Sequence, residues 1–306
     1  MRYLDPKNDL TFKRIFGEHP HLLKSFLNAV LPLENPIESL EYLAQELVPN
    51  IPLFKNSIVD VRCKDQKGRQ FIVEMQMLWT DSFKSRVVFN ASKAYVKQID
   101  RGEEYKSLEP VYSLNLINEN FEPNLEEHFH HYKIIHTQHN DKIIKGLEFV
   151  FIELPKFKAK QYRDKKLQVL WLRFLTEIKD NQEKIDQDFS QSKDINEALE
   201  LLKESAYSKK ELESYDRYWD SISSEKTLIV DAYDEGKIEG KIEGEQIGIE
   251  KGEQIGLEKG EQIGLKKERD KGIIKAIQRG KLSIEEIAED FDVTVEYVLE
   301  IKKTMS

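Results

Sequence analysis

The N-terminal segment from position 9 to 31 carries apolar residues that recur every three or four positions. This spacing is typical of one side of an amphipathic helix, and the residues are Phe12, Ile15, Phe16, Leu22, Leu23, Phe26, Leu27 and Val30. Gly17 and Pro20 interrupt the pattern, so we expect a break between two helical segments. Pro32 and Pro36 predict the end of the second segment.

The next stretch alternates between apolar and polar residues, which is typical of β-strands. One strand is predicted near 39–48. The segments SIVDVRC (57–63) and RQFIVEMQM (69–77) follow, and KDQKG between them predicts a turn. Together the two segments predict a β-hairpin.

A helix over 81–101 and two buried apolar strands, 110–118 and 147–154, follow the hairpin. This order of elements predicts an α/β fold with a mixed sheet flanked by helices. From about position 165 to 234 the chain changes to charged, amphipathic helices, of which QVLWLRFLTEI (168–178) is the most apolar. We expect them to form a helical extension packed on the sheet domain.

A glycine at every fourth position distinguishes the segment from Gly236 to Gly264. Three near-identical units, GEQIGIEK, GEQIGLEK and GEQIGLKK, begin at Gly244, Gly252 and Gly260. Each glycine disfavours an isolated helix by about 1 kcal/mol relative to alanine. The segment is therefore either a flexible spacer or a helix whose glycine ridge lets a second copy of the chain approach closely.

The C-terminal tail has clear helix-initiation signals. Ser283 and Glu286 form a capping box, and Thr294 is placed to cap a second helix, which gives the outline of a helix-turn-helix. Glu296 and Glu300 would repel phosphates, which argues against extensive contacts with DNA bases. The tail is either a DNA-binding element or a small packing or protein-interaction motif. We therefore divide the chain into a sheet domain over 1–160, a helical extension over 161–235, a glycine-repeat connector over 236–272 and the tail over 273–306.

Composition narrows the class of protein. The chain has 306 residues, of which 39% are hydrophobic and 34% charged, with a net charge of -9 and one Cys. The single Cys excludes a disulfide framework and a Cys-rich zinc module. The start, MRYLDPKNDL, lacks the apolar region of a signal peptide, and no run approaches the roughly 18 apolar residues of a membrane span, so we expect a cytoplasmic protein. The acidic total argues against neutralising many phosphates but permits a local basic groove.

The hairpin carries the candidate chemistry. Val59, Val61 and Cys63 are expected on its apolar face, and Asp60 on the opposite face. With the turn centred near Lys67, Asp60 lies across from Glu74 with Cβ atoms about 5 Å apart. Two carboxylates at that distance repel unless a cation lies between them, and Mg²⁺ is a suitable one. The alternative is a pair of solvated acids on the wet side of the hairpin.

An ordered set of motifs resembles the PD-(D/E)xK nuclease superfamily and, more closely, the Rpn family of recombination-promoting nucleases and transposases. The set comprises DLTFKRIFG (9–17), the VDV and EMQ motifs of the hairpin, RVVFNASKAYVKQIDRGEEYKSLEPVYSLNLI (86–117) and the glycine repeat with its capped tail. No single tripeptide is specific, but the order extends over nearly the whole chain. The resemblance implies a PD-(D/E)xK restriction-endonuclease-like core followed by helices.

The resemblance also implies roles for individual residues. Asp60 and Glu74 match the acids that hold Mg²⁺ against the scissile phosphate, with Mn²⁺ as a substitute. Gln76 stands where the superfamily usually has lysine, although E-x-Q is a usual form in the Rpn family; a neutral amide cannot accept a proton as a free lysine can. Asp9 matches a position that lends a further acid, with a helix N-cap as the alternative. Lys13, one turn later, either replaces the missing lysine or is a solvated helix residue.

The resemblance implies a Mg²⁺-dependent DNA endonuclease associated with recombination or transposon-like activity. Arg86, Lys93 and Lys97 share one side of the predicted helix and are candidates for DNA-backbone contacts. DNA and a second copy of the chain, in a dimer, are the expected partners, and neither an organic cofactor nor a membrane is expected. The alternative is a non-catalytic DNA-binding or scaffold protein that keeps the fold and oligomerises through the glycine repeat.

Two further groups of residues suggest other chemistry. Five histidines lie between His128 and His139, and a transition-metal site there is set aside in favour of a polar loop or edge strand. Cys63 has no evident base nearby in the sequence. We therefore interpret it as a buried structural thiol rather than a nucleophile.

Overall fold

The computed structural model describes residues 2–47, 57–100, 102–159, 166–180, 182 and 184–305. These residues form two units, Met1–Thr227 and Leu228–Ser306. The final residue of the strand predicted over 39–48, the last residue of the helix predicted over 81–101, and positions 161–165 of the predicted extension lie outside the described residues.

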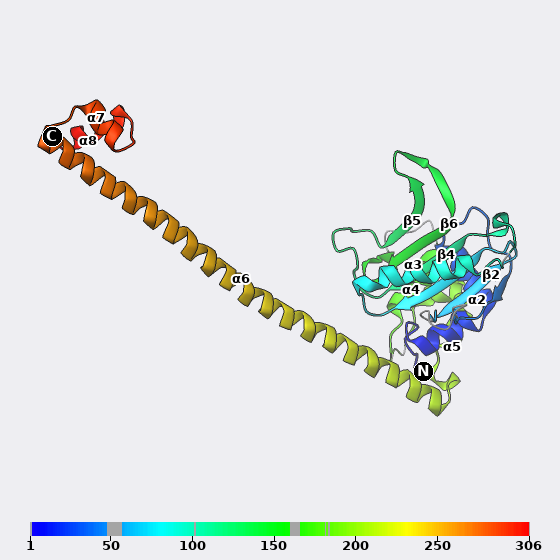
Figure 1. Ribbon diagram of the computed structural model, residues 1–306. Coiled ribbons are helices and arrows are strands. Elements are labelled where there is room, and N and C mark those ends of the chain that lie inside the picture. Colours follow the sequence, from blue (N-terminus) through cyan, green and yellow to red (C-terminus); the bar gives the residue numbers. More distant parts are fainter. Residues whose placement is uncertain are drawn as a thin grey trace. The chain divides into compact units, whose positions relative to one another are not determined.

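A mixed six-stranded sheet organises the first unit, with strand order β1-β2-β3-β4-β6-β5 (Figure 1). Strands β3, β4 and β6 run parallel, whereas β1, β2 and β5 pair antiparallel with their neighbours. Because the central strands are parallel, their carboxyl ends meet at one edge of the sheet, where ligands commonly bind in α/β folds. The strands are β1 Leu40–Tyr42, β2 Val61–Asp65, β3 Gln70–Gln76, β4 Val111–Ile117, β5 Phe129–His136 and β6 His139–Glu153.

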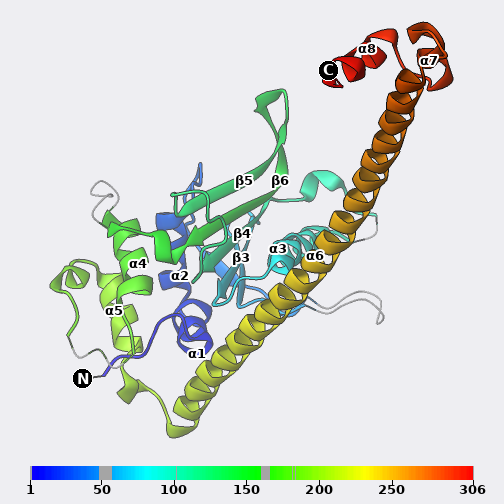
Figure 2. The same ribbon diagram turned by 90° about the vertical axis from the view of Figure 1, so that its left-hand side faces the viewer.

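Helices cover both faces of this sheet. Helix α3 packs on one face, where Val87 and Ala91 contribute to its apolar contacts (Figure 1). The other face is covered by α1, α2, α4 and α5 around Trp171, whose ring lies 5.5 Å from that of Phe16 (Figure 2). The bounds are α1 Asp9–Phe12, the π-helical turn η1 Lys13–Gly17, α2 Pro20–Val30, α3 Asp81–Val96, α4 Lys166–Glu177 and α5 Lys193–Leu201, with short 3₁₀ turns at Tyr105–Ser107, Leu154–Lys156, Gln187–Gln191 and Glu204–Ala206.

The predicted α/β fold with a mixed, helix-flanked sheet is confirmed. The break in the first helix is also confirmed, because η1 ends at Gly17 and α2 begins at Pro20. The hairpin has the predicted register: Val61 pairs with Val73, which centres the turn on Lys67.

The prediction of a regular strand over 57–63 is wrong in one detail. Regular pairing begins at Val61, and the chain bends at Asp60. Val59 therefore packs with Ile72 on the α3 side, while Val61 and Cys63 face the other core. An uninterrupted alternation would have placed all three on one face.

The β5–β6 hairpin extends well beyond the predicted strand at 147–154. Its outer part carries Ile134, Ile135, Ile143 and Ile144, which are 41–68% exposed. Two register shifts interrupt the β5–β6 pairing. Because both faces of this ribbon are exposed, it lacks the alternation on which strand prediction depends.

Helix α6, Lys209–Arg279, includes the whole glycine repeat. The repeat is therefore helical. From Leu228 to Arg269 its residues are exposed, and an added Cβ at any glycine from Gly236 to Gly264 would meet nothing within 4 Å. Within the described part of the chain, no helix combines the length and apolar character needed to cross a membrane.

The tail forms a small core of its own with the end of α6. Helices α7, Ile284–Asp290, and α8, Val295–Thr304, follow α6. The capping box is confirmed, since Ser283 N–H donates to Glu286 Oε2 at 2.7 Å and Glu286 N–H donates to Ser283 Oγ at 3.2 Å. Thr294 caps α8 as predicted.

Gly272 allows Phe291 to pack directly on α6, because a Cβ there would lie 2.5 Å from a ring carbon of Phe291. We predict that Gly272→Ala destabilises the tail by about 1 kcal/mol, since the ring displacement outweighs the gain in helix propensity. Gly264→Ala is the matched control. Its Cβ meets no neighbour, so only the gain in helix propensity remains, and hydrogen exchange in that part of α6 should become slower. Hydrogen exchange of tail amides measures both effects. Equal or greater tail protection in Gly272→Ala would contradict the prediction.

Candidate active site

Asp60 lies at the bend that precedes β2. Its carboxylate Oδ2 accepts a hydrogen bond of 2.7 Å from the backbone N–H of Met75, and Gln45 Nε2 donates to its backbone carbonyl at 2.6 Å. The carboxylate thus satisfies a β3 donor at the point where β2–β3 pairing ends. Burial, together with the charges of Glu74 and Asp9, raises the pKa of Asp60 to about 6 despite the Met75 hydrogen bond.

Glu74 is held on the α3 face of β3. Asn90 Nδ2 donates to its Oε1 at 3.0 Å, and Ser57 Oγ donates to Asn90 Oδ1 at 2.5 Å. Arg86 lies 3.6 Å from Glu74 Oε2. Burial raises the pKa of Glu74 above its ordinary value, although the Asn90 hydrogen bond and the Arg86 charge lower it.

Gln76 connects the end of β3 to α3. Its side-chain oxygen accepts a hydrogen bond of 2.7 Å from Arg86, and its amide nitrogen donates to the carbonyl of Leu78 at 2.5 Å. The amide therefore orients a guanidinium beside Glu74. This arrangement places a permanent positive charge close to the position where the superfamily carries lysine.

Asp9 and Lys13 form an ion pair of 2.7 Å one turn apart. The N-cap of α1 is Asn8, whose side chain accepts from Leu10 N–H at 3.0 Å, so the interpretation of Asp9 as the cap is wrong. Lys13 opens the π-helical turn η1, an irregularity often found at functional sites. The charge of Asp9 raises the pKa of Asp60, and the charge of Lys13 lowers it.

The remaining candidate cations lie along α3 and at its end. Lys93 donates to the carbonyl of Leu47 at 2.7 Å, and its ammonium lies over the ring of Phe89. Lys97 is the C-cap residue of the helix. Arg86, the third predicted backbone-contact residue, contacts both Glu74 and Gln76.

Sequence reasoning missed Asn90 and Ser57, which orient Glu74. Asn90 lies four residues after Arg86 and is fully buried. A buried asparagine in the middle of a helix requires hydrogen-bond partners, because its amide would otherwise lose those of water. The place of Asn90 within the predicted helix was therefore the available signal that it has a hydrogen-bond partner, although the sequence did not show that the partner is Glu74.

Cys63 and the histidines of the β5 region have the structural positions that we expected for them. Cys63 is buried, and burial raises the pKa of its thiol to about 12, which leaves it protonated. His130, His131 and His136 lie on β5, an edge strand. Among the described residues there is no cluster of three or more His, Cys, Asp or Glu arranged to hold a metal ion.

The two acids nevertheless fit a hard divalent cation. Both offer oxygen ligands, and burial raises the pKa of both, which indicates negative charge that the neighbouring groups compensate only in part. Mg²⁺ commonly takes only one or two protein carboxylates and completes its shell with water and phosphate oxygens. Asp60 and Glu74 would be the protein ligands.

The chain belongs to the PD-(D/E)XK nuclease family transposases, whose family model matches residues 6–232. This finding confirms the predicted family resemblance, and it supports a nuclease- or transposase-like function with DNA as the substrate. Nucleases of this superfamily typically use divalent metal ions. No curated protein and no solved structure matches the chain.

We predict that Asp60→Asn stabilises the metal-free protein by about 1–3 kcal/mol at pH 8. The folded-state pKa of Asp60 is raised to about 6, so ionisation above that pH opposes folding. The advantage of asparagine should shrink as the pH falls through 6 and vanish below about 4, where the unfolded acid is protonated too. Urea unfolding in EDTA measures the difference.

Asp231→Asn, on the exposed surface of α6, is the matched control and should change the free energy of unfolding little over the same pH range. A destabilised Asp60→Asn at pH 8 would show that the carboxylate is not under electrostatic strain.

Proposed function

We propose that the protein is a Mg²⁺-dependent DNA endonuclease that acts in recombination or transposon-like mobility. The observation that carries the proposal is the pair of buried acids, Asp60 and Glu74, at the carboxyl-terminal part of β3. Both have raised pKa values, and a bound cation would relieve their unfavourable charge. We propose a cytoplasmic location for this activity.

The residues of the chain orient the site before DNA binds. Met75 N–H fixes the Asp60 carboxylate, and Asn90 fixes Glu74. Bound Mg²⁺ would polarise the phosphate and lower the pKa of the attacking water. Such a pre-oriented carboxylate pair reduces the reorganisation needed when charge develops on the phosphate.

Arg86 supplies the positive charge that the superfamily draws from lysine. Gln76 holds the guanidinium through the 2.7 Å hydrogen bond, so the amide acts through Arg86 rather than as a proton acceptor. A guanidinium remains protonated and can bind a phosphate oxygen, but it cannot serve as the general base. Asp9 and Lys13 would adjust the charge beside Asp60, and Lys93 and Lys97 would contact the DNA backbone farther along α3.

One observation favours the non-catalytic alternative. Gln76 carries a neutral amide that cannot act as a general base, and both of its polar atoms are engaged, with Arg86 and with the carbonyl of Leu78. In that case the chain would bind DNA or act as a scaffold and oligomerise through α6. Direct cleavage assays separate the two proposals.

We also propose that the chain forms a dimer through the exposed glycine repeat. Ile and Leu side chains flank the glycines of α6 and are exposed, for example Ile255 at 51% and Leu257 at 76%. A helix with so little cover gains from burying this apolar area. The division into a nuclease core (1–160), an extension (161–235), a connector (236–272) and a tail (273–306) remains our proposal for the functional parts.

We predict that purified protein cleaves supercoiled plasmid in Mg²⁺, and that Asp60→Ala and Glu74→Ala each reduce the rate at least about 100-fold, because each removes a metal ligand. Gel electrophoresis of nicked and linear products measures cleavage, with EDTA and Asp231→Ala as controls. Equal cleavage by wild type and both site variants would identify a contaminating nuclease. Tight DNA binding without cleavage in any metal would favour the scaffold.

Deletion of residues 236–267 should lower the oligomeric state, because it removes the glycine repeat and its apolar neighbours. Light scattering of the purified proteins gives the mass directly. The control is Asp231→Asn, an exposed substitution that retains the repeat. An unchanged mass after the deletion would reduce the repeat to a connector.

A further inference from the structure

Two exposed apolar side chains lie next to the residues that orient Glu74. Ser57 donates to Asn90 at 2.5 Å, and Asn90 donates to Glu74 at 3.0 Å. Ile58 follows Ser57 in the chain and is 68% exposed, and Phe89 precedes Asn90 and is 41% exposed. We call Ile58 and Phe89 the apolar rim. Each of its members is one residue away from the hydrogen-bonded pair beside Glu74.

Phe89 also lies between two cationic side chains on one side of α3. Arg86, Phe89 and Lys93 are spaced three and four residues apart, so they share that side of the helix. Arg86 contacts both Glu74 and Gln76, and the Lys93 ammonium lies 5.0 Å from the centre of the Phe89 ring. Sites for single-stranded nucleic acid have this combination, because cations bind the phosphates while an aromatic ring stacks on a base.

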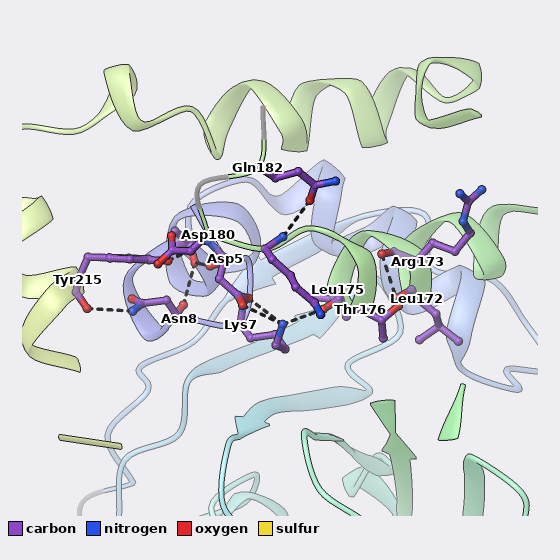
Figure 3. A network of polar contacts seen from close by, with 12 residues as sticks. Asp5, Lys7, Asn8, Leu172, Arg173, Leu175, Thr176, Asp180, Gln182 and Tyr215 are labelled. Atoms are coloured by element: carbon purple, nitrogen blue, oxygen red, sulfur yellow. Dashed lines mark hydrogen bonds and ion pairs between the residues drawn. The ribbon is translucent and has the colours of Figure 1, made fainter. Parts of the chain in front are cut away.

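The N-terminal segment, in contrast, is held by a buried polar network (Figure 3). The side chain of Asn8 accepts from Leu10 N–H at 3.0 Å and donates to the carbonyl of Tyr215 at 3.1 Å. Asp5 N–H donates to the hydroxyl of Tyr215 at 2.9 Å, and that hydroxyl donates to Asp180 at 2.7 Å. Buried networks whose members are satisfied hold one geometry. These contacts therefore fix α1 in the fold, whereas the apolar rim on the α3 side is exposed.

Cationic and apolar side chains alternate along this side of α3. In order they are Arg86, Phe89, Lys93, the exposed Val96 and Lys97. The alternation suits a nucleic-acid strand, which presents both phosphates and bases to a protein. The core of a protein–protein interface is instead depleted of lysine. In a duplex both faces of each base are covered by stacking, so a side chain that stacks on a base requires one that is unpaired.

We propose that the apolar rim receives an unpaired base next to the phosphate at the candidate site, so that the substrate is single-stranded DNA or DNA with unpaired bases at the cut. Phe89 stacks on the base, and Ile58 adds apolar contact. Arg86 and Lys93 bind the phosphates on either side of it. This inference rests on the proposed endonuclease function and names the form of DNA on which that site acts.

The test measures DNA binding by the full chain carrying Asp60→Asn, which lacks one proposed metal ligand. Fluorescence anisotropy in Mg²⁺ gives the Kd for a labelled single strand and for the duplex of the same sequence. Adding Phe89→Ala should weaken binding of the single strand by about tenfold or more, because one stacked base is lost, and should leave duplex binding within about twofold. Phe89→Trp should keep the single-strand affinity. Val88→Ala is the matched control, because Val88 is exposed but lies about 100° around the helix from Phe89.

These binding measurements do not depend on cleavage. A selective loss of single-strand affinity in Phe89→Ala would support the base site even if the wild type cut no DNA and the proposed function failed. A single-strand Kd within about twofold of the parent, or an equal loss for strand and duplex, would overturn the base site even if the wild type cut plasmid. A parent protein that binds no single strand would overturn it too. Unchanged melting temperatures of the variants would show that the differences do not come from unfolding.

Discussion

The burial of two carboxylates, those of Asp60 and Glu74, is the constraint on which the geometry of the candidate site depends. Asp60 lies at the bend before β2 and Glu74 lies on β3, and their charges lie in a region where water cannot screen them fully. Each acid accepts a hydrogen bond from a donor that the fold holds in place. For Asp60 the donor is a backbone N–H of β3, and for Glu74 it is the side chain of the buried Asn90. The bend at Asp60 ends regular pairing and frees that N–H for the carboxylate. The bend at Asp60 therefore accounts both for the irregular start of β2 and for the position of the Asp60 carboxylate.

The cations near these acids are held at a distance that leaves the negative charge only partly balanced. Arg86 is 3.6 Å from Glu74 and is half exposed, while Lys13 is engaged with Asp9. Closer pairing would neutralise the acids and so weaken the metal binding that we propose for them. The site combines partial compensation, enough to permit folding, with residual charge that a ligand can use.

The sequence predicted what depends on local patterns. The break at Gly17, the hairpin register about Lys67 and the capping box at Ser283 all follow from spacing over a few residues, and the structure confirms them. The sequence also predicted that Asp60 and Glu74 face one another across the hairpin, whereas regular pairing begins only at Val61. It could not predict the change of side at Val59, because a single bend reverses the alternation. The partners of Asn90 and of Tyr215 were also beyond prediction, since contacts between distant segments leave no periodic signal. The β5–β6 ribbon was missed because neither of its faces is buried.

That ribbon has a consequence for handling the protein. Ile134, Ile135, Ile143 and Ile144 are exposed on two strands that project beyond the sheet, and such strands can pair with other chains. Lys133, Lys142 and Lys145 lie among them and are exposed. Charged residues next to apolar strands act as gatekeepers that oppose edge-to-edge aggregation. Acetylation of these lysines would remove their positive charge and leave the exposed isoleucines of the ribbon without charged neighbours of this kind.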